Sequence, residues 1–284
     1  FADRYGGGDI KMFGGEPLLV PDTVAAAVEA AETNDAITRV YVSTNGLGLS
    51  AEWLQWFRGF KKGVLTVSMD GAPEDHRRHR KALDGIPDAY DHVVALMPEL
   101  LRTPRVVVTQ TIPPATAERA AQNFAHLRGL GFWRFNFLPG YFIGWRDDQL
   151  LKLTAAFDGI AAQVRESWAK DERLYIRNLF TRAPTPFFNS GLIVDADKRI
   201  HPSNVGLSGS LAGLLDRTCV GTLDEPPTAE VLARASAEIN GLLQETLPEK
   251  VWASTLAADA QLTRFCEGLY PAYLEDRARR RAVA

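Results

Sequence analysis

Short runs of apolar and β-branched residues alternate with longer segments of helical periodicity from about residue 10 to residue 180. The apolar runs predict strands at Ile10–Phe13, Arg39–Ser43, Val64–Met69, Arg105–Thr111, Arg134–Leu138 and Arg173–Arg177. The periodic segments predict helices at Pro21–Thr33, Ser50–Phe57, Asp88–Leu101, Thr116–Leu130 and Asp147–Trp168. This alternation predicts an α/β fold with a mostly parallel sheet and right-handed crossovers.

Polar and glycine-rich signals follow directly after four of the predicted strands. They are Gly14-Gly15-Glu16, Thr44-Asn45-Gly46, Asp70-Gly71 and Pro139-Gly140. Because ligands bind at the carboxyl ends of parallel strands, these strand ends predict one shared site. Five or six strands are too few for a closed eight-stranded barrel, so we expect an open or partial barrel.

The sequence pattern changes after about residue 180. Residues Ala183 to Pro186 indicate a linker or turn, and Gly191–His201 predicts a β-hairpin. Thr228–Leu243 and Ala253–Ala278 have helical patterns. We therefore predict a core over residues 1–182 and a small α+β extension over residues 183–284.

Composition narrows the class of protein. The 284 residues are 46% hydrophobic and 24% charged, and no run of about 20 apolar residues predicts a membrane span. The net charge of -3 argues against a nucleic-acid partner, and two cysteines make a reducing cytoplasm the default location. The chain begins at Phe1 without a signal-peptide pattern, so we expect a natural protein that starts earlier.

The segment Lys11 to Leu19 contains the strongest single motif, Gly14-Gly15-Glu16-Pro17. Two glycines at a strand end let the backbone turn and approach a ligand closely, and the Glu16 carboxylate suits an ammonium group. The simpler interpretation is a strand-to-helix turn in which Glu16 contributes under ~1 kcal/mol as a helix N-terminal charge.

Two further motifs follow in order on the next two predicted strands. They are Thr44-Asn45-Gly46 and the series Ser68, Asp70, Gly71, His76 and Arg80. Together with Gly-Gly-Glu-Pro, this series resembles the radical S-adenosylmethionine (radical SAM) enzymes, particularly the branch with a SPASM-type C-terminal extension. The resemblance extends over Asp9 to Gly140. It implies a partial (β/α) barrel that lacks its first βα unit.

The resemblance also implies a cofactor-binding set. Its members are Gly14, Gly15, Glu16, Asn45, Ser68, Asp70, Arg80 and Leu138. Gly14, Gly15 and Glu16 match the motif that holds the methionine amino group, while Ser68 and Arg80 match positions that bind its carboxylate.

Three members of the set have weaker or different roles. Leu138 matches a position against adenine, Asn45 is a weaker candidate for the same pocket, and Asp70 faces cofactor or substrate. Bland alternatives stay open, because Ser68 and Asp70 suit turn capping and Leu138 suits a core position.

The chain departs from the family at the iron–sulfur cluster. The family holds a [4Fe–4S] cluster with a Cys-x-x-x-Cys-x-x-Cys segment upstream of the Gly-Gly-Glu motif. Only thirteen residues precede Gly14, and none is cysteine. Two explanations remain open, an upstream segment outside these residues or a relative that has lost the cysteines. The cluster is expected only if the upstream segment exists.

The extension is also depleted in thiolates. The stretch Leu192–Ser203 resembles a SPASM start, but Ser203 stands where a thiolate is expected. Cys219 and Cys266 are far apart in the sequence, so the tail is interpreted as a cluster-free remnant.

Three functions remain. The first is a radical SAM enzyme that generates a 5′-deoxyadenosyl radical and abstracts hydrogen from a peptide or protein, with a reductant as partner. The second is a cluster-less pseudoenzyme or peptide-binding partner. The third is an unrelated α/β enzyme that uses Glu16, Asp70 and His76 for acid–base chemistry, although no nucleophile–base pair is evident.

Overall fold

A computed structural model describes residues 5–82, 84–180, 191–207 and 209–283. The chain divides into two compact units. The first contains Phe1–Gly140, Asp147–Phe180 and Ala260–Ala284, and the second contains Tyr141–Arg146 and Thr181–Asp259. The predicted boundary after residue 182 and the predicted linker at Ala183 to Pro186 lie outside the described residues.

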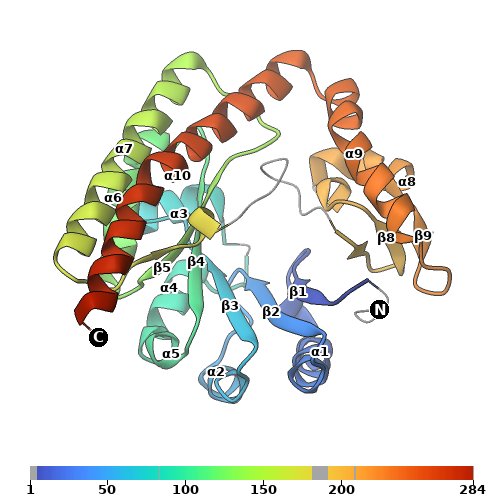
Figure 1. The fold of residues 1–284 in the computed structure, drawn as a ribbon, viewed down its shortest axis with the longest axis horizontal. Coiled ribbons are helices and arrows are strands. Elements are labelled where there is room, and N and C mark those ends of the chain that lie inside the picture. The colour runs from blue at the N-terminus through green and yellow to red at the C-terminus, as the bar shows by residue number, and fades with distance from the viewer. Residues whose placement is uncertain (1–4, 83, 181–190, 208, 284) are drawn as a thin grey trace. The chain divides into compact units, whose positions relative to one another are not determined.

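A six-stranded sheet forms the centre of the first unit (Figure 1). Its strands are β1 (Gly8–Met12), β2 (Ile37–Thr44), β3 (Gly63–Ser68), β4 (Val106–Ile112), β5 (Arg134–Pro139) and β6 (Tyr175–Ile176). They lie in the order β1-β2-β3-β4-β5-β6, and every neighbouring pair is parallel. The predicted parallel sheet is confirmed, and all its carboxyl ends share one edge.

The two faces of this sheet differ in chemistry. One face is apolar and buried, and includes Val40, Val42, Leu65, Val67, Val108, Phe135 and Phe137. The opposite face, here called the polar face, carries the in-register rows Lys11–Tyr41, Ser43–Thr66, Ser68–Thr109–Asn136 and Thr111–Leu138. Side chains alternate along a strand, so each row lies on one face.

Helices cover the apolar face. They are α1 (Pro21–Thr33), α2 (Ala51–Phe57), α3 (Pro73–His79), α4 (Ala89–Ala95), α5 (Met97–Arg102), α6 (Ala120–Gly129) and α7 (Asp147–Ala169). Phe124 of α6 packs edge-to-face on Phe135 and Phe137, with centroids 4.8 and 5.6 Å away. Such aromatic pairs add to the area that burial removes from water.

Two helical predictions need correction. The predicted helix over Asp88–Leu101 ends at Leu96 and restarts as α5, because Pro98 in its first turn lacks an N–H and its ring excludes a continuous helix. The predicted helix over Thr116–Leu130 begins as a 3₁₀ turn at Ala117–Arg119 before α6. The Ser50 cap on α2 is confirmed, since its Oγ accepts from the Trp53 N–H at 3.1 Å.

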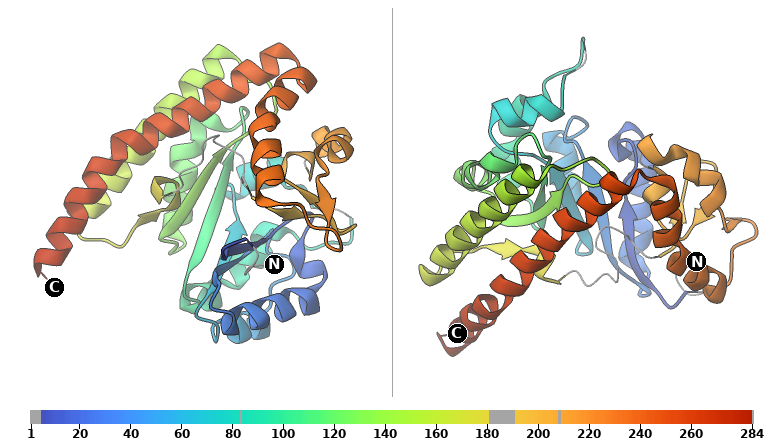
Figure 2. Two further views of the ribbon diagram at one scale, coloured as in Figure 1. Left: turned by 45° about the vertical axis from the view of Figure 1, so that its right-hand side comes forward. Right: turned by 90° about the horizontal axis from the view of Figure 1, so that it is seen from above.

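The long helix α10 (Glu249–Val283) extends the helical layer of the first unit from residue 260 onward. This part lies beside α7 in both views of Figure 2. The Thr154 hydroxyl donates to the Gln261 side-chain oxygen at 2.7 Å, and Phe265 stacks on Phe157 with centroids 5.0 Å apart. The predicted tail helix therefore contributes its second half to the core of the first unit.

The second unit contains a three-stranded antiparallel sheet with two helices. Its elements are β7 (Ile193–Val194), β8 (Arg199–His201), α8 (Leu215–Thr218), β9 (Gly221–Thr222) and α9 (Ala229–Thr246). Its apolar core consists of Val205, Leu211, Leu214, Ile239 and Leu243. The predicted hairpin is confirmed, with β7 and β8 joined at Asp195 to Lys198.

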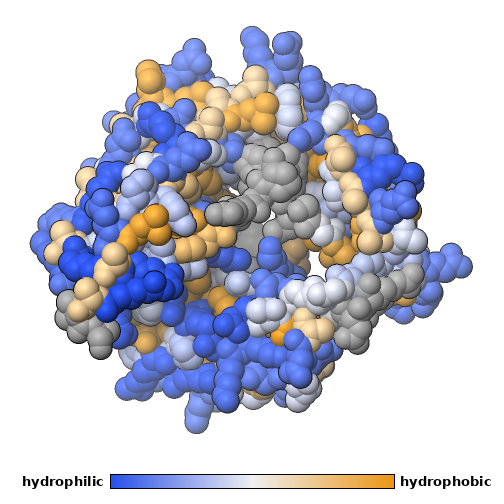
Figure 3. Space-filling view, in the orientation of Figure 1, coloured by the Kyte–Doolittle hydropathy of each residue, from blue (hydrophilic) through white to orange (hydrophobic). Residues whose placement is uncertain are grey.

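The outer surface is mostly hydrophilic in the view of Figure 3. Among the described residues, no helix combines the length and apolar character that crossing a bilayer requires.

Candidate functional site

Glu16 joins the ends of β1 and β2. Its carboxylate accepts from the Thr44 hydroxyl at 2.7 Å, the Asn45 backbone N–H at 2.7 Å and the Leu18 N–H at 3.0 Å. Thr44 is 2% exposed, so this clamp is anchored in the interior. A carboxylate offers about four acceptor positions, so most of the acceptor capacity of Glu16 is already used.

The two glycines before Glu16 leave open space above the backbone. A Cβ added at Gly14 or Gly15 would meet no atom within 4 Å, and Gly14 has φ +145°, which disfavours other residues. Among the described residues, no hydrogen bond reaches the carbonyl oxygens of Gly14 and Gly15. The loop therefore presents unused backbone acceptors at the strand end.

Asn45 shapes the end of β2. Its side-chain oxygen accepts from the Leu47 N–H at 2.9 Å, and its own N–H is held by Glu16. This pattern is an Asx turn, which fixes the loop that follows a strand.

Asp70 and Arg80 form a buried ion pair at the end of β3. The Arg80 Nε and a terminal nitrogen donate to the two Asp70 oxygens at 2.8 and 3.2 Å, and the Thr111 N–H of β4 donates to Asp70 at 3.1 Å. Asp70 is 4% exposed, whereas the Arg80 side chain is 28% exposed. The pair orients the guanidinium and leaves its second terminal nitrogen available.

His76 fixes the turn that contains this pair. Its Nδ1 accepts from the Asp70 N–H at 3.3 Å, and its carbonyl accepts from the Arg80 N–H at 2.9 Å. Burial lowers the pKa of His76, which keeps the imidazole neutral. His76 is therefore a positioning group inside the motif, and its acid–base use as a third function gains no partner here.

The start of α3 is locked to α6 through Asn123. Its side-chain oxygen accepts from the Ala72 N–H at 3.0 Å, and its amide donates to Asp75 at 2.8 Å. A Cβ at Gly71 would lie 2.1 Å from Asn123. Sequence reasoning missed Asn123, because it lies about fifty residues from its partners and no local pattern marks it.

Ser68 and Leu138 lie on the polar face near the strand ends. Ser68 shares a row with Thr109 and Asn136, and Leu138 lies one row further along with Thr111. Leu138 is 36% exposed, so this apolar side chain is not buried in the core. The structure brings Glu16 to Asn45 and Asp70 to Arg80, while Ser68 and Leu138 have no described contact with those pairs.

The residues of this chain do not suit an iron–sulfur cluster. Cys219 and Cys266 are the two cysteines of the sequence, and they belong to different units. Within the described ranges, no group of three or more His, Cys, Asp or Glu side chains could hold a metal ion. A [4Fe–4S] cluster needs three or four thiolates.

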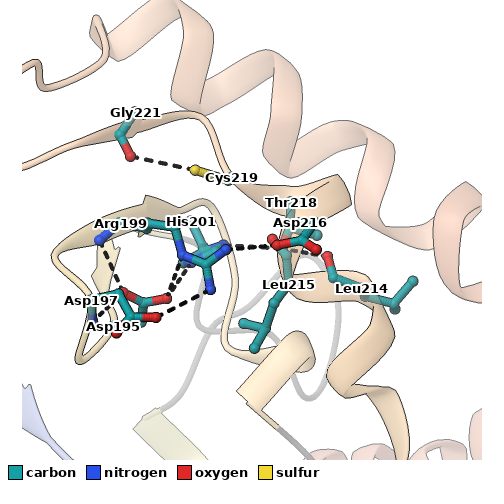
Figure 4. Close-up of polar contacts among 10 residues, drawn as sticks. All are labelled: Asp195, Asp197, Arg199, His201, Leu214, Leu215, Asp216, Thr218, Cys219 and Gly221. Carbon is teal, nitrogen blue, oxygen red and sulfur yellow. Dashed lines mark hydrogen bonds and ion pairs between the residues drawn. The ribbon is translucent and has the colours of Figure 1, made fainter.

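Hydrogen bonds hold the hairpin of the second unit together (Figure 4). His201, which is 1% exposed, contacts the Asp195 carboxylate through Nε2 at 3.2 Å and the Thr218 hydroxyl through Nδ1 at 3.1 Å. Arg199 bridges Asp195 and Asp216 at 3.1 and 2.7 Å. The Ser203 hydroxyl accepts from the Val205 N–H at 3.3 Å, so Ser203 stabilises a turn.

Comparison with family models and with curated proteins gave no match. Among solved structures, the fold is that of a SPASM-type radical SAM enzyme. The chain is similar to anSMEcpe, an anaerobic sulfatase-maturating enzyme with bound AdoMet, with TM-score 0.66, 17% identity, and coverage of 84% of this chain and 70% of that chain.

Two further anSMEcpe structures contain a peptide in addition to AdoMet. The structure with the Kp18Cys peptide has TM-score 0.65 and 17% identity over 84% of this chain and 70% of that one. The structure with the Cp18Cys peptide has TM-score 0.64 and 17% identity over 82% and 69%. At this level of identity the similarity shows the fold.

Proposed function

We propose that the carboxyl ends of β1 to β5 bind S-adenosylmethionine, and that the protein acts on a peptide as a radical SAM enzyme. We further propose that the sheet is a partial (β/α) barrel of that family without its first βα unit. The observation that carries the proposal is the convergence of three motifs on one sheet edge, where Glu16 joins β1 to β2 and Asp70 joins β3 to β4.

The ammonium group of the cofactor suits the Gly14–Gly15 loop. The backbone carbonyls of Gly14 and Gly15 are acceptors without described donors, and open space lies above them. The carboxylate of Glu16 lies at the same turn and supplies negative charge, but three donors already hold it. We therefore assign Glu16 to positioning the loop and to electrostatic attraction of the ammonium group.

The carboxylate of the cofactor suits Ser68 and Arg80. Arg80 has a terminal nitrogen that does not contact Asp70, and Asp70 holds the guanidinium plane in place. A fixed guanidinium loses little freedom when it binds a carboxylate. Ser68 supplies a hydroxyl donor on the polar face at the end of the same strand.

The adenine ring suits Leu138, which presents an exposed apolar surface near the end of β5. Asn45 orders the loop after β2 and supports the pocket indirectly through the Asx turn.

When bound beside a reduced [4Fe–4S] cluster, S-adenosylmethionine supplies a 5′-deoxyadenosyl radical that abstracts hydrogen. The cysteines of this chain do not fit that cluster, so radical formation in this proposal depends on thiolates outside these 284 residues and on a reductant. The residues described above bind and orient the cofactor.

A peptide substrate is the second part of the proposal. It is supported by the similarity of fold to enzyme structures that contain AdoMet and a peptide. The polar rows of the sheet, with hydroxyl and amide groups at Ser68, Thr109 and Asn136, suit hydrogen bonding to a peptide backbone.

A second candidate is a cluster-less protein that binds a peptide without radical chemistry. The absence of a thiolate triad from the sequence favours it. Anaerobic reconstitution of the full-length protein separates the two candidates. About four irons per chain would support the enzyme, and an iron-free, colourless protein that still binds peptide would support the binder.

Calorimetric titration of S-adenosylmethionine tests the site itself. Arg80→Ala is expected to weaken binding at least tenfold, because a charge-assisted bidentate contact is lost. Arg78→Ala is the matched control, since Arg78 lies on the same helix and is exposed. Equal affinity in wild type and Arg80→Ala, or equal loss in Arg78→Ala, would refute the assignment.

A further inference from the structure

The amino-terminal half of the polar face is strongly cationic. Its charged residues, from the strands and the residues that flank them, are Lys11, Arg39, Arg105, Arg134, Arg173 and Arg177. We call this set the cationic half. At the described strand positions of the polar face, Asp9 is the one acidic residue. This excess of positive charge lies in a chain whose net charge is -3.

The cations approach one another across the sheet. The Arg177 guanidinium lies 4.4 Å from the centre of the Tyr41 ring, although β6 and β2 are not neighbours in the sheet. Burial, and then the charge of Arg177, lowers the pKa of Lys11. Burial, and then the charge of Arg39, lowers the pKa of Arg105. The sheet therefore curves enough to gather charges from distant strands.

Neutral groups hold several of these cations. Arg105 donates to the Gly63 and Phe60 carbonyls at 2.8 and 2.9 Å, and Arg134 lies 3.7 Å over the Trp133 ring. Within the part of the chain that the structure describes, Arg39, Arg105 and Arg134 have no carboxylate within salt-bridge distance. Uncompensated cations on a concave face attract anions and raise their local concentration.

The cationic half lies at a defined depth below the strand ends. Lys11 precedes Gly14 by three residues, which is about 10 Å along an extended strand. An anion held there would lie about 10 Å from the proposed amino-acid end of the cofactor, a distance that about three residues of extended peptide cover.

We propose that the cationic half binds carboxylates of an acidic segment of the substrate peptide. This inference rests on the proposed peptide substrate. Nucleic acid is disfavoured by the net negative charge of the chain and by the curvature that brings Arg177 onto Tyr41, which excludes a duplex. An acidic peptide is a single extended chain whose carboxylates form bidentate contacts with guanidinium groups.

Fluorescence anisotropy with labelled hexaglutamate tests the inference, with hexaglutamine and a thymidine hexanucleotide as comparison probes. Hexaglutamate is expected to bind with a salt-dependent Kd, and hexaglutamine is not. The double variant Arg39→Gln/Arg134→Gln should raise the Kd for hexaglutamate about tenfold. The matched control, Arg102→Gln/Arg165→Gln, removes the same charge from exposed helical positions and should change it less than twofold.

Three outcomes would overturn the inference: no binding of hexaglutamate, tighter binding of the oligonucleotide, or an equal loss in the control variant. Titration of S-adenosylmethionine is measured in parallel and should be unchanged in Arg39→Gln/Arg134→Gln. Failure of wild type to bind S-adenosylmethionine would refute the proposed function, whereas failure to bind hexaglutamate alone would refute only this inference.

Discussion

The Asp70–Arg80 pair gives a quantitative prediction for stability. Asp70 is 4% exposed and accepts two hydrogen bonds from Arg80 and one from the Thr111 N–H. Removing one partner of a buried ion pair costs about 3–5 kcal/mol, because the other charge stays buried. The Arg80 side chain is 28% exposed, so water reaches the pair and we expect the lower end, about 3 kcal/mol, for Arg80→Met.

The partner variant completes a double-mutant cycle. Asp70→Asn keeps the shape and an acceptor for Thr111, so we expect a loss of about 2 kcal/mol. The double variant should lose about 2 kcal/mol less than the sum of the single losses, since the pair is removed only once. Urea unfolding gives each free energy.

Asp91→Asn serves as the control. Asp91 also pairs with an arginine of α3, Arg77, but its side chain is 67% exposed, so the substitution should cost no more than about 1 kcal/mol. Additive single losses at Asp70 and Arg80, or an equal cost for Asp91→Asn, would refute the view that the pair is a buried structural unit.

Three other predictions concern the same region. Gly71→Ala should lower the melting temperature strongly, because a Cβ would lie 2.1 Å from Asn123 at φ +146°; an unchanged melt would contradict this. Glu16→Ala should cost about 2–3 kcal/mol in urea unfolding through three lost hydrogen bonds to a charged group, against under about 0.5 kcal/mol for exposed Glu29→Ala. Burial lowers the pKa of His76 from about 6.5, so stability is present above this pH and is lost below it as the unfolded chain takes up a proton. His76→Gln should flatten that loss between pH 7 and pH 5, and an unaltered pH profile would contradict the buried neutral imidazole.

The central strands were predictable because each is a short β-branched run between helical segments. Arg39–Ser43 was predicted and β2 extends over Ile37–Thr44. The prediction at Arg173–Arg177 was too long, since β6 pairs only with β5 and spans Tyr175–Ile176. An edge strand receives hydrogen bonds from one side, which the local sequence does not reveal.

The helix α3 was missed for a different reason. Its seven residues, Pro73–His79, include four basic and two acidic side chains, so hydrophobic periodicity gives no signal. The contacts that hold it come from Asn123 and Arg119 near the start of α6, distant in the sequence.

The candidate site was predictable as a location but not in its contacts. Parallel strands place their carboxyl ends on one edge, so the gathering of Gly14, Asn45 and Ser68 followed from the pattern. The commitment of Glu16 to β2 and of Arg80 to Asp70 depends on tertiary geometry. These side chains were expected to reach a ligand directly, and both are instead held by protein groups.

Calorimetric titration of two ligands, S-adenosylmethionine and 5′-methylthioadenosine, tests the central claim most directly, because the second lacks the amino-acid end. The account predicts that wild type binds S-adenosylmethionine more tightly and that Arg80→Ala removes most of this difference while leaving the 5′-methylthioadenosine affinity within about twofold. Equal affinities of wild type for both ligands would contradict it.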